Sequence, residues 1–413
     1  MKIVQVNKFA YPRGGAERHM LDLIKVLQAH GHEVSVFAMR HPENLLWPDS
    51  DLFVSQVNFE HPRSFSEKLR AAGRMLWSFE AARKFGELLD RRQPDLVHVH
   101  NIYHQISPSI LREAKKRGIP VVMTLHDFKF IAPNYLLYAD GKVSEATKPN
   151  KYWKLIPHRE IKHSFAASLL CALEMYLHKT LRVYEKYVDV FIAPSQFMAD
   201  KVREYGVQAK RVEVLANFMP QRDLPSSQEK GYALFFGRLA KEKGVDVLID
   251  AWRELKDIPL KIAGTGPEEL KLRQQAASVA GHQISFVGHQ NGKALDKLIA
   301  GARLIVFPSR WYENQPMSLI EAFRFQKPVI ASRLGAIPEL VHKNDGGRLV
   351  PPNDSGSITE AVRELWNNAE LQRMGEYNYQ RSLLFSSEGY YEKYLSLFDE
   401  ISDKSQSRTE TAQ

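Results

Sequence analysis

The stretch of residues 304–330 constrains the fold more than any other part of the chain. A short apolar run at residues 304–307 predicts a buried strand. Pro316 stands where a helix should begin, because proline is tolerated at a first helical position that needs no N–H donor, and apolar residues then recur at helical spacing over residues 317–325. Pro328 opens the next apolar run. Strand, loop, helix and strand in this order predict part of a doubly wound, parallel α/β sheet.

Two carboxylates lie inside this unit, one in its loop and one in its helix. Glu313 follows the aromatic pair Trp311-Tyr312 in a loop that leaves the carboxyl end of a strand, where open α/β sheets bind their ligands. The amides at the helix start, between Glu313 and Glu321, offer an anion site. Sugar hydroxyls at Glu313, a diphosphate at the helix start and ribose hydroxyls at Glu321 would together match a nucleotide sugar. The alternative is that both glutamates are solvated surface carboxylates.

A similar unit precedes this one in the sequence. Residues 232–236 predict a strand, and the loop that follows carries Arg238 and Lys243. Both cations can reach a diphosphate from this loop, arginine through forked hydrogen bonds and lysine as a point charge. The alternative is two solvated surface cations. A further predicted strand, residues 259–263, ends in a turn that begins at Gly264.

The first half of the chain begins with the same order of elements. Residues 2–8 predict a strand, Gly14 and Gly15 lie in the loop after it, and residues 16–30 predict an amphipathic helix. Such a loop can cradle a phosphate. The alternative is a loop whose glycines are needed for positive φ angles.

Another predicted strand of the first half has polar residues at its end. His126 and Asp127 follow this strand, residues 120–125, and we expect them to face a ligand. The alternative is a histidine that packs in the core or caps an element. Residues 128–161 predict a long irregular segment rich in aromatic residues, which is a candidate acceptor lid because loops of this length are usually functional.

These motifs resemble those of a known enzyme family. The run from Glu313-Asn314-Gln315-Pro316 to Glu321, with the glycine at residue 335, is similar to the signature of family-four retaining glycosyltransferases of the GT-B fold. The runs 237–244 and 14–18 resemble two further loops of that family. Many members have Gly-Phe-Gly where this chain has Asn314-Gln315-Pro316, so the motif does not identify the donor sugar.

The resemblance implies both a fold and a reaction. The fold is α/β, with two doubly wound, Rossmann-like domains that face each other across a cleft and a C-terminal helix that crosses back to the first domain. The reaction is transfer of a sugar from a nucleoside-diphosphate sugar to a glycan or lipid-linked acceptor, with retention, front-face attack and no metal or other cofactor. Cell-surface polysaccharide assembly is the expected setting, as in the synthesis of lipopolysaccharide or exopolysaccharide.

The resemblance also assigns residues and domain limits. The expected domains are residues 1–217 with the returning helix 385–401 for the acceptor, residues 218–384 for the nucleotide sugar, and a disordered tail at 402–413. The expected catalytic residues are His126, Arg238, Lys243 and Glu313. The expected donor-binding residues are Gly15, Arg238, Lys243, Gly264, Asn314, Gln315, Pro316, Met317 and Glu321. The expected acceptor-side residues are Gly14, Gly15, His126 and Asp127.

The charge of the chain is unevenly distributed. Residues 1–217 contain 32 Lys and Arg against 23 Asp and Glu, whereas the remaining residues contain 25 of each. An anionic partner of the first half, such as a membrane surface or a lipid diphosphate, is therefore expected, and no nucleic-acid-binding motif is present. Residues 62–92 carry eight basic and four acidic residues with apolar ones between them. They predict either surface helices packed on the sheet or an interfacial helix on anionic lipid.

The remaining features bound the compartment and the alternatives. A single cysteine, Cys171, excludes an intramolecular disulfide, and no cluster with metal-ligand spacing is visible. No signal peptide or membrane-spanning segment is predicted, so we expect a cytoplasmic protein that binds peripherally to the inner face of the membrane. Two other functions stay open: a sugar-nucleotide epimerase of the same fold, and a non-catalytic scaffold of a polysaccharide assembly complex.

Overall fold

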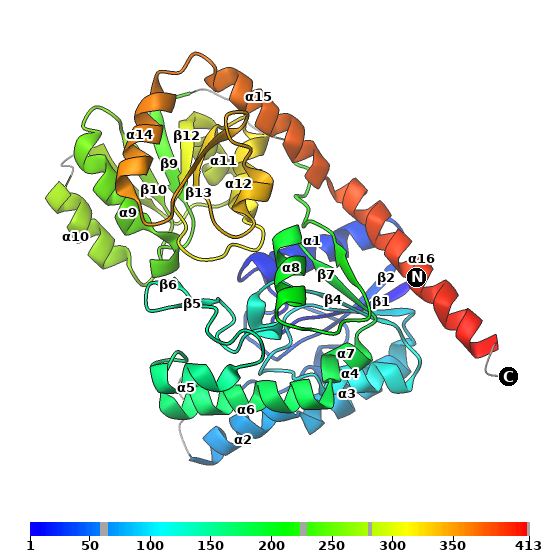
Figure 1. Cartoon of the computed structure of the whole chain (residues 1–413). Helices are drawn as coiled ribbons and strands as arrows, with labels where there is room; N and C mark the ends of the chain where they lie inside the picture. Colours follow the sequence, from blue (N-terminus) through cyan, green and yellow to red (C-terminus); the bar gives the residue numbers. More distant parts are fainter. Residues whose placement is uncertain (58–64, 224–228, 280–282, 411–413) are drawn as a thin grey trace. The chain divides into compact units, whose positions relative to one another are not determined.

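The computed structural model describes residues 1–57, 65–223, 229–279 and 283–410, without the side chains of 65–69 and 402–410. The chain forms two compact units, labelled by element in Figure 1. Unit 1 comprises Met1–Leu136, Glu145–Phe218 and Ser387–Gln413, and unit 2 comprises Leu137–Ser144 and Met219–Ser386. A short segment of the first half therefore belongs to unit 2, and the last helix belongs to unit 1.

Unit 1 is built on a six-stranded parallel sheet with the strand order β2-β1-β3-β4-β7-β8. Its strands are β1 (Lys2–Val6), β2 (Glu33–Phe37), β3 (Leu96–Val99), β4 (Val121–Thr124), β7 (Val190–Ala193) and β8 (Val212–Val214). The central strands are nearly continuous runs of buried apolar residues, because helices cover both faces of a parallel sheet. The predicted strands of the first half are confirmed, with ends that differ by one or two residues.

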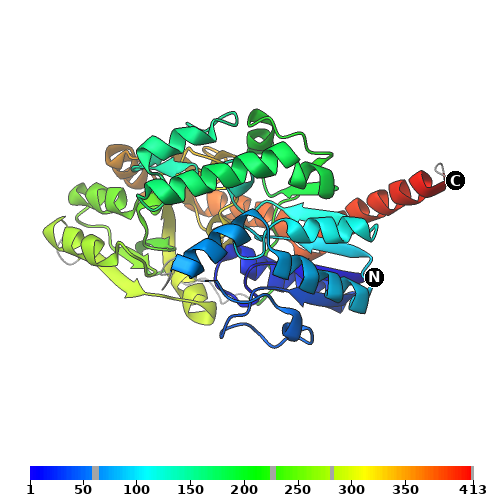
Figure 2. The same cartoon turned by 90° about the horizontal axis from the view of Figure 1, so that it is seen from below.

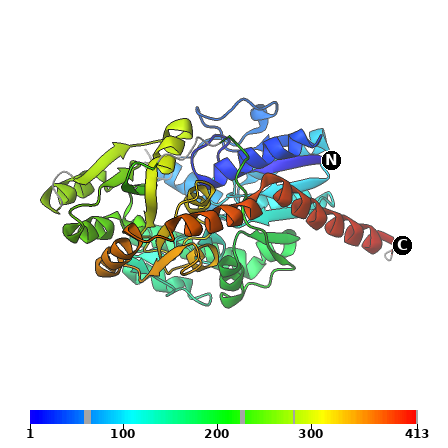
Figure 3. The same cartoon turned by 90° about the horizontal axis from the view of Figure 1, so that it is seen from above.

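The helices of unit 1 include the returning C-terminal helix. They are α1 (Gly15–Ala29), α2 (Phe65–Leu76), α3 (Phe79–Arg92), α4 (Ser109–Lys116), α5 (Leu155–His158), α6 (Phe165–Leu181), α7 (Val183–Tyr187), α8 (Gln196–Glu204) and α16 (Ser387–Glu410). Figure 3 shows α16 in red alongside α1, with which it is in contact. Tyr390, Tyr394 and Phe398 of α16 pack in one core cluster with Ile3 and Leu96 of the sheet. The expected return of the C-terminal helix to the first unit is thus confirmed.

Unit 2 repeats the architecture with the strand order β11-β10-β9-β12-β13-β14, again all parallel. Its strands are β9 (Tyr232–Phe236), β10 (Leu260–Ala263), β11 (Ile284–Gly288), β12 (Ala302–Phe307), β13 (Val329–Ser332) and β14 (Gly347–Val350). Its helices are α9 (Val245–Ala251), α10 (Glu269–Val279), α11 (Gly292–Gly301), α12 (Met317–Arg324), α13 (Ile337–Leu340), α14 (Ser355–Trp366) and α15 (Leu371–Ser382). Two doubly wound α/β units confirm the predicted fold class.

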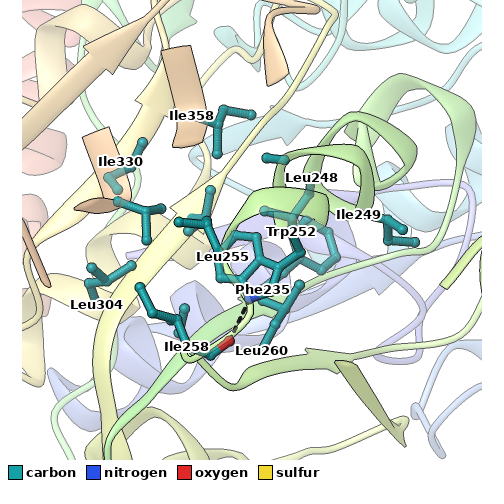
Figure 4. Packing of buried hydrophobic residues seen from close by; sticks show 14 of the residues in the cluster. Phe235, Leu248, Ile249, Trp252, Leu255, Ile258, Leu260, Leu304, Ile330 and Ile358 are labelled. Atoms are coloured by element: carbon teal, nitrogen blue, oxygen red, sulfur yellow. Dashed lines mark hydrogen bonds between the residues drawn. The ribbon is translucent and has the colours of Figure 1, made fainter. Parts of the chain in front are cut away.

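One core cluster of unit 2 surrounds Trp252, which is fully buried (Figure 4). Its indole Nε1 donates a hydrogen bond of 2.7 Å to the carbonyl of Ile258, so the one polar atom of the ring is satisfied. Leu248 and Leu304 line the same cluster from a helix and from the sheet. Phe235 of β9 and Leu304 of β12 both belong to this cluster, so it holds together the two strands from which the loops of Lys243 and Glu313 leave.

The region between β4 and β7 differs in part from the sequence prediction. The segment 128–161 contains only short elements, namely η2 (Phe128–Phe130), the hairpin β5 (Tyr138–Ala139) with β6 (Lys142–Val143), η3 (Tyr152–Lys154) and α5. The helical stretch after this segment is divided into α6 and α7, because Arg182 between them has a left-handed φ of 51°. The helix α16 continues to Glu410, through most of the segment predicted to be a disordered tail.

Candidate active site

Glu313, in the loop after β12, is a buried carboxylate of unit 2 with several side-chain hydrogen-bond donors. The residue is only 6% exposed. Its Oε1 accepts hydrogen bonds from Lys243 Nζ (2.6 Å), Ser309 Oγ (2.8 Å) and Trp311 Nε1 (2.7 Å). Among the described residues every side-chain donor to this carboxylate contacts Oε1, so Oε2 is the oxygen left to accept a hydrogen bond from a ligand. The alternative of a solvated surface carboxylate is wrong for Glu313.

Lys243 lies at the end of η4 (Lys241–Lys243), in the loop after β9. Besides its ion pair with Glu313, its ammonium lies 5.1 Å from the ring centre of Trp311 and 5.6 Å from that of Phe307. The two aromatic faces and the carboxylate together hold the cation in place. Arg238, from the same loop, is exposed and makes no ion pair within the described ranges. Arg238 is therefore the cation that can reach a diphosphate without giving up a protein partner.

Close backbone crossings bring the three loops of this region together. Gly264, at the end of β10, has a φ of 137°, and a Cβ there would lie 1.8 Å from the carbonyl oxygen of Gly237. Gly244, after Lys243, has a φ of 68°, and its Cβ would lie 2.1 Å from the carbonyl oxygen of Pro308. At each of these two positions the positive φ and the nearby carbonyl oxygen leave room only for glycine. Gly264 thus has a structural role that is sufficient to explain it, whether or not it contacts a donor.

The start of α12 follows Glu313 closely in sequence. Pro316 is the N-cap of this helix rather than its first residue, and no side chain caps the end. The amide of Leu319 donates the first backbone hydrogen bond of the turn, to the carbonyl of Pro316. The amides of Met317 and Ser318 come before this bond, at the partly exposed start of the helix. Asn314, Gln315 and Met317 are all partly exposed around this end. The geometry is suited to an anion.

Glu321 lies one turn further along α12 and has a partner that the sequence did not indicate. Its Oε1 accepts a hydrogen bond of 2.8 Å from Arg222, whose guanidinium also lies 2.6 Å from Oδ1 of Asp296. Arg222 comes from the segment between β8 and β9. Arg324, also on α12, holds that segment through the carbonyl oxygens of Pro220 and Arg222. The structure therefore joins Lys243 to Glu313 and Glu321 to Arg222, as two separate pairs.

Unit 1 carries a chain of histidines at the carboxyl ends of β3 and β4. His126 Nε2 and His100 Nδ1 are 2.8 Å apart, and His100 Nε2 donates a hydrogen bond of 2.8 Å to Gln5 Oε1. His98 is bonded to Thr124 Oγ1 at 2.8 Å. His19, on α1, packs edge-on against His126 with ring centres 5.5 Å apart. Only His126 was predicted as a site residue.

Burial fixes the protonation of this histidine chain. It lowers the pKa of His19 and of His98 to about 3 and holds the pKa of His100 and of His126 well below its usual range. All four rings are therefore neutral at pH 7. Since His100 Nε2 donates to Gln5, its Nδ1 must accept the proton of His126 Nε2–H, a tautomer assigned from the hydrogen-bond network. The Nδ1 of the half-buried His126 is then an acceptor.

The remaining predicted residues of unit 1 have local structural roles. Gly14 is the N-cap of α1 and Gly15 its first residue, and neither has a positive φ, so that alternative explanation of the two glycines is wrong. Asp127 caps η2 by accepting a hydrogen bond of 2.9 Å from the amide of Lys129, and burial raises the pKa of Asp127. Nothing in these contacts tests binding of an acceptor.

One buried cluster could in principle hold a metal ion. His104, Cys171 and Glu174 place one ligand atom each within 4.8 Å of one another. The Glu174 carboxylate, however, already accepts hydrogen bonds from Lys129 Nζ (2.7 Å) and His104 Nε2 (3.1 Å). Burial also raises the pKa of Cys171 to about 11, which disfavours the thiolate that a metal needs. The donor set is thus arranged for an internal ion pair.

Comparisons with known proteins cover nearly the whole chain. The model of the family described as Glycosyltransferase Family 4 matches residues 13–220, and that described as Glycosyl transferases group 1 matches residues 220–381. The O-antigen chain mannosyltransferase C of Escherichia coli is 25% identical over 96% of this chain and 98% of its own. The phosphatidyl-myo-inositol mannosyltransferase of Mycolicibacterium smegmatis is 26% identical over 90% and 86%. Among solved structures, Anabaena HepE in complex with UDP and glucose has a TM-score of 0.67, at 17% identity, and covers 97% of this chain and 100% of that chain.

Proposed function

The chain belongs to glycosyltransferase family 4 and has the two-domain α/β GT-B fold, and on this premise we propose that it transfers a sugar from a nucleoside-diphosphate sugar to a glycan or lipid-linked acceptor, with retention. The names of its relatives support a role in polysaccharide or lipid-linked sugar assembly. The observation that carries the proposal is the Lys243–Glu313 pair, with Arg238 available in the same loop.

In the proposed reaction, the bond between the anomeric carbon and the diphosphate oxygen breaks while the acceptor oxygen bonds to the same face of that carbon. The acceptor proton passes to the departing phosphate oxygen. Negative charge grows on the diphosphate, so Arg238 and the amides at the start of α12 would stabilise it electrostatically, without a metal ion. Lys243 would either share its charge between Glu313 and the diphosphate or move to the latter.

The two carboxylates would hold the donor at its two ends. Glu313 Oε2 would accept a hydrogen bond from a hydroxyl of the donor sugar, and Glu321 would accept from the ribose after exchanging Arg222 for it. Asn314, Gln315, Pro316 and Met317 would line the space between them. His126 Nδ1 would accept a hydrogen bond from a hydroxyl of the transferred sugar, and Gly14, Gly15 and Asp127 would face the acceptor.

The proposal is tested by nucleotide release from UDP- and GDP-sugars, with and without a lipid-linked acceptor. We expect release that depends on the acceptor and persists in EDTA. Arg238→Ala should lower turnover by about a hundredfold or more, as does removal of other charge-stabilising donors. Arg253→Ala, an exposed arginine of the same unit that pairs with Asp250, is the matched control and should leave the rate unchanged.

Other outcomes would assign a different function. Release without any acceptor would favour the epimerase, and the absence of release from every nucleotide sugar that binds would favour a scaffold. Loss of the rate in EDTA, with rescue by magnesium or manganese, would contradict the metal-free mechanism.

A further inference from the structure

The helix α6 of unit 1 exposes an apolar face to solvent. Phe165, Leu169, Leu173, Leu177 and Leu181 follow one another at intervals of four residues, and each is between 38% and 55% exposed. The exposed positions of this helix carry no charged residue. Figure 2 shows α6 from below as a long helix beside α5, which it contacts. An apolar face of this length on one helix marks an interaction surface.

The buried side of α6 mixes apolar and polar residues: Ala172 and Met175 pack in an apolar cluster, and several polar side chains are buried beside them. Ser168, Cys171, Glu174 and His178 are buried. Glu174 forms an ion pair of 2.7 Å with Lys129, and His178 Nε2 lies 2.9 Å from the carbonyl oxygen of Leu76. Turning the leucines inward would break these contacts and leave a buried charge unpaired. The outward position of the apolar face is thus built into the fold.

The spacing of the apolar residues favours a lipid surface over a second helix. Four residues turn a helix by about 400°, so the apolar direction drifts by about 40° at each step and covers about 160° in all. A coiled-coil seam instead alternates steps of three and four residues to stay in line. A broad apolar band suits a helix that lies in the plane of a membrane interface.

The segments at both ends of α6 are basic. Before the helix lie Lys151, Lys154, Arg159 and Lys162 against one acidic residue, Glu160. After it come Arg182 and Lys186, both exposed, whereas Glu185 between them is buried. Such flanks complement anionic lipid, each basic residue contributing roughly 1 kcal/mol near the surface.

A tryptophan adds to the same surface. Trp153, in η3, is 55% exposed, and its backbone amide lies 3.4 Å from the hydroxyl of Tyr176 on α6. Trp153 therefore lies next to α6, and its side chain is exposed there. Tryptophan is enriched where a protein meets the headgroup level of a membrane.

The structure weakens the earlier candidate for membrane contact, residues 62–92. Phe85 and Leu88 of α3 are fully buried, and Arg74 and Arg92 are paired with Glu80 and Asp49. The packed-helix interpretation is therefore correct for these residues of α3. Phe79 at the start of α3 is 80% exposed, so contact of this segment with lipid stays a prediction; residues 58–64 lie outside the described residues. Within the described ranges, moreover, no helix combines the length and the apolar character needed to cross a bilayer.

We propose that α6, together with Trp153 and the basic segments at its ends, docks on an anionic lipid bilayer and lies in the plane of its interface. Attachment is reversible, because the apolar face enters only the headgroup and upper acyl region. The surface is separate from the residues proposed for catalysis, so membrane binding can be measured whether or not the proposed reaction is correct.

The test is co-sedimentation of the full chain with vesicles of phosphatidylcholine alone or mixed with phosphatidylglycerol. The parent protein should bind the anionic vesicles, and binding should weaken when salt rises from about 0.1 M to about 1 M, as the Debye length falls from about 10 Å to about 3 Å. The double variant Leu173→Gln/Leu177→Gln should bind at least about tenfold more weakly, since two apolar side chains no longer enter the lipid. Leu270→Gln, an exposed leucine on α10 that is 71% accessible, is the matched control and should bind like the parent.

Three results would overturn the proposal: a parent protein that stays in the supernatant with anionic vesicles, a double variant that binds as well as the parent, or a parent dimer that the double variant converts to a monomer in light scattering. The last result would assign the face to a second copy of the chain. If the double variant does not fold, Lys154→Ala/Arg159→Ala replaces it. That variant should lose binding to anionic vesicles selectively, and unchanged binding would be equally decisive.

Discussion

Replacing Lys243 by methionine tests whether the pair with Glu313 organises the candidate site. The change keeps most of the side-chain length and removes the ammonium. Taking one partner from a buried ion pair costs about 3–5 kcal/mol, because the other charge is left without compensation. Here Ser309 and Trp311 still donate to Glu313, and 18% of the Lys243 side chain is exposed, so we expect a loss of about 2 kcal/mol.

The loss should appear as a lower melting temperature of unit 2. At about 2–4 °C per kcal/mol for a domain of 150–250 residues, it corresponds to about 4–8 °C. Urea unfolding followed by tryptophan fluorescence gives the free energy, since Trp252 and Trp311 both lie in unit 2. Lys293→Met is the matched control: Lys293 is exposed on α11, and its loss should change stability by less than about 0.5 kcal/mol.

A double-mutant cycle with Glu313→Gln separates the pair from its surroundings. Once Glu313 is neutral, Lys243→Met should cost little, and the coupling energy should be about 1 kcal/mol or more. A coupling below about 0.5 kcal/mol would show that the ion pair is not formed in solution. The conclusion that Oε2 of Glu313 is left for a ligand would then also be wrong.

Three further predictions concern other residues. Glu321→Ala should weaken nucleotide binding by roughly 1.5–3 kcal/mol through the loss of charge-assisted hydrogen bonds, and calorimetry with UDP and GDP that finds unchanged affinity would refute the ribose assignment. Gly244→Ala should destabilise unit 2 by at least about 1 kcal/mol, since its φ of 68° disfavours a side chain and the Cβ would meet a carbonyl oxygen; an unchanged urea midpoint would contradict this. Burial alone would raise the pKa of Glu174, but Lys129 and His104 together lower it to about 2. An unfolded glutamate has a pKa of about 4.3, so above that pH the Glu174 carboxylate contributes up to about 3 kcal/mol to the free energy of unfolding. This contribution is lost as the pH falls toward 2. Glu174→Gln should flatten that part of the pH dependence of stability, and an identical acid profile would rule the assignment out.

The sequence predicted the fold well because its signals are local. Strands of a buried parallel sheet are short apolar runs, and proline and glycine mark where they end, as at Pro308 and Gly264. The break at Arg182 could not be predicted, because neither glycine nor proline is present there and the left-handed conformation is set by packing. The same holds for the hairpin β5–β6, whose residues belong to unit 2 although they lie within the sequence of unit 1.

The site was predicted less completely, because its partners are distant in sequence. Glu313 was identified from its loop, but its pairing with Lys243 spans 70 residues. Arg222 gave no signal, since it lies among residues typical of a linker. The histidine chain did leave a trace: Gln5 and His98 are polar residues at paired positions of otherwise apolar neighbouring strands, which alone would have suggested a polar line through the sheet.

The return of α16 to unit 1 also sets an order of assembly. During synthesis the sheet of unit 1 is complete once β8 has emerged. The side chains of Tyr390, Tyr394 and Phe398, which complete one of its core clusters, are made only after all of Met219–Ser386. Unit 2, apart from one short hairpin, is continuous and can fold while unit 1 still exposes apolar surface. The N-terminal unit is therefore the last to be finished, against the usual order of domain folding along a chain. A nascent or truncated chain that ends before Ser387 would offer this uncovered core to chaperones, whereas a chain that ends after Phe398 would not.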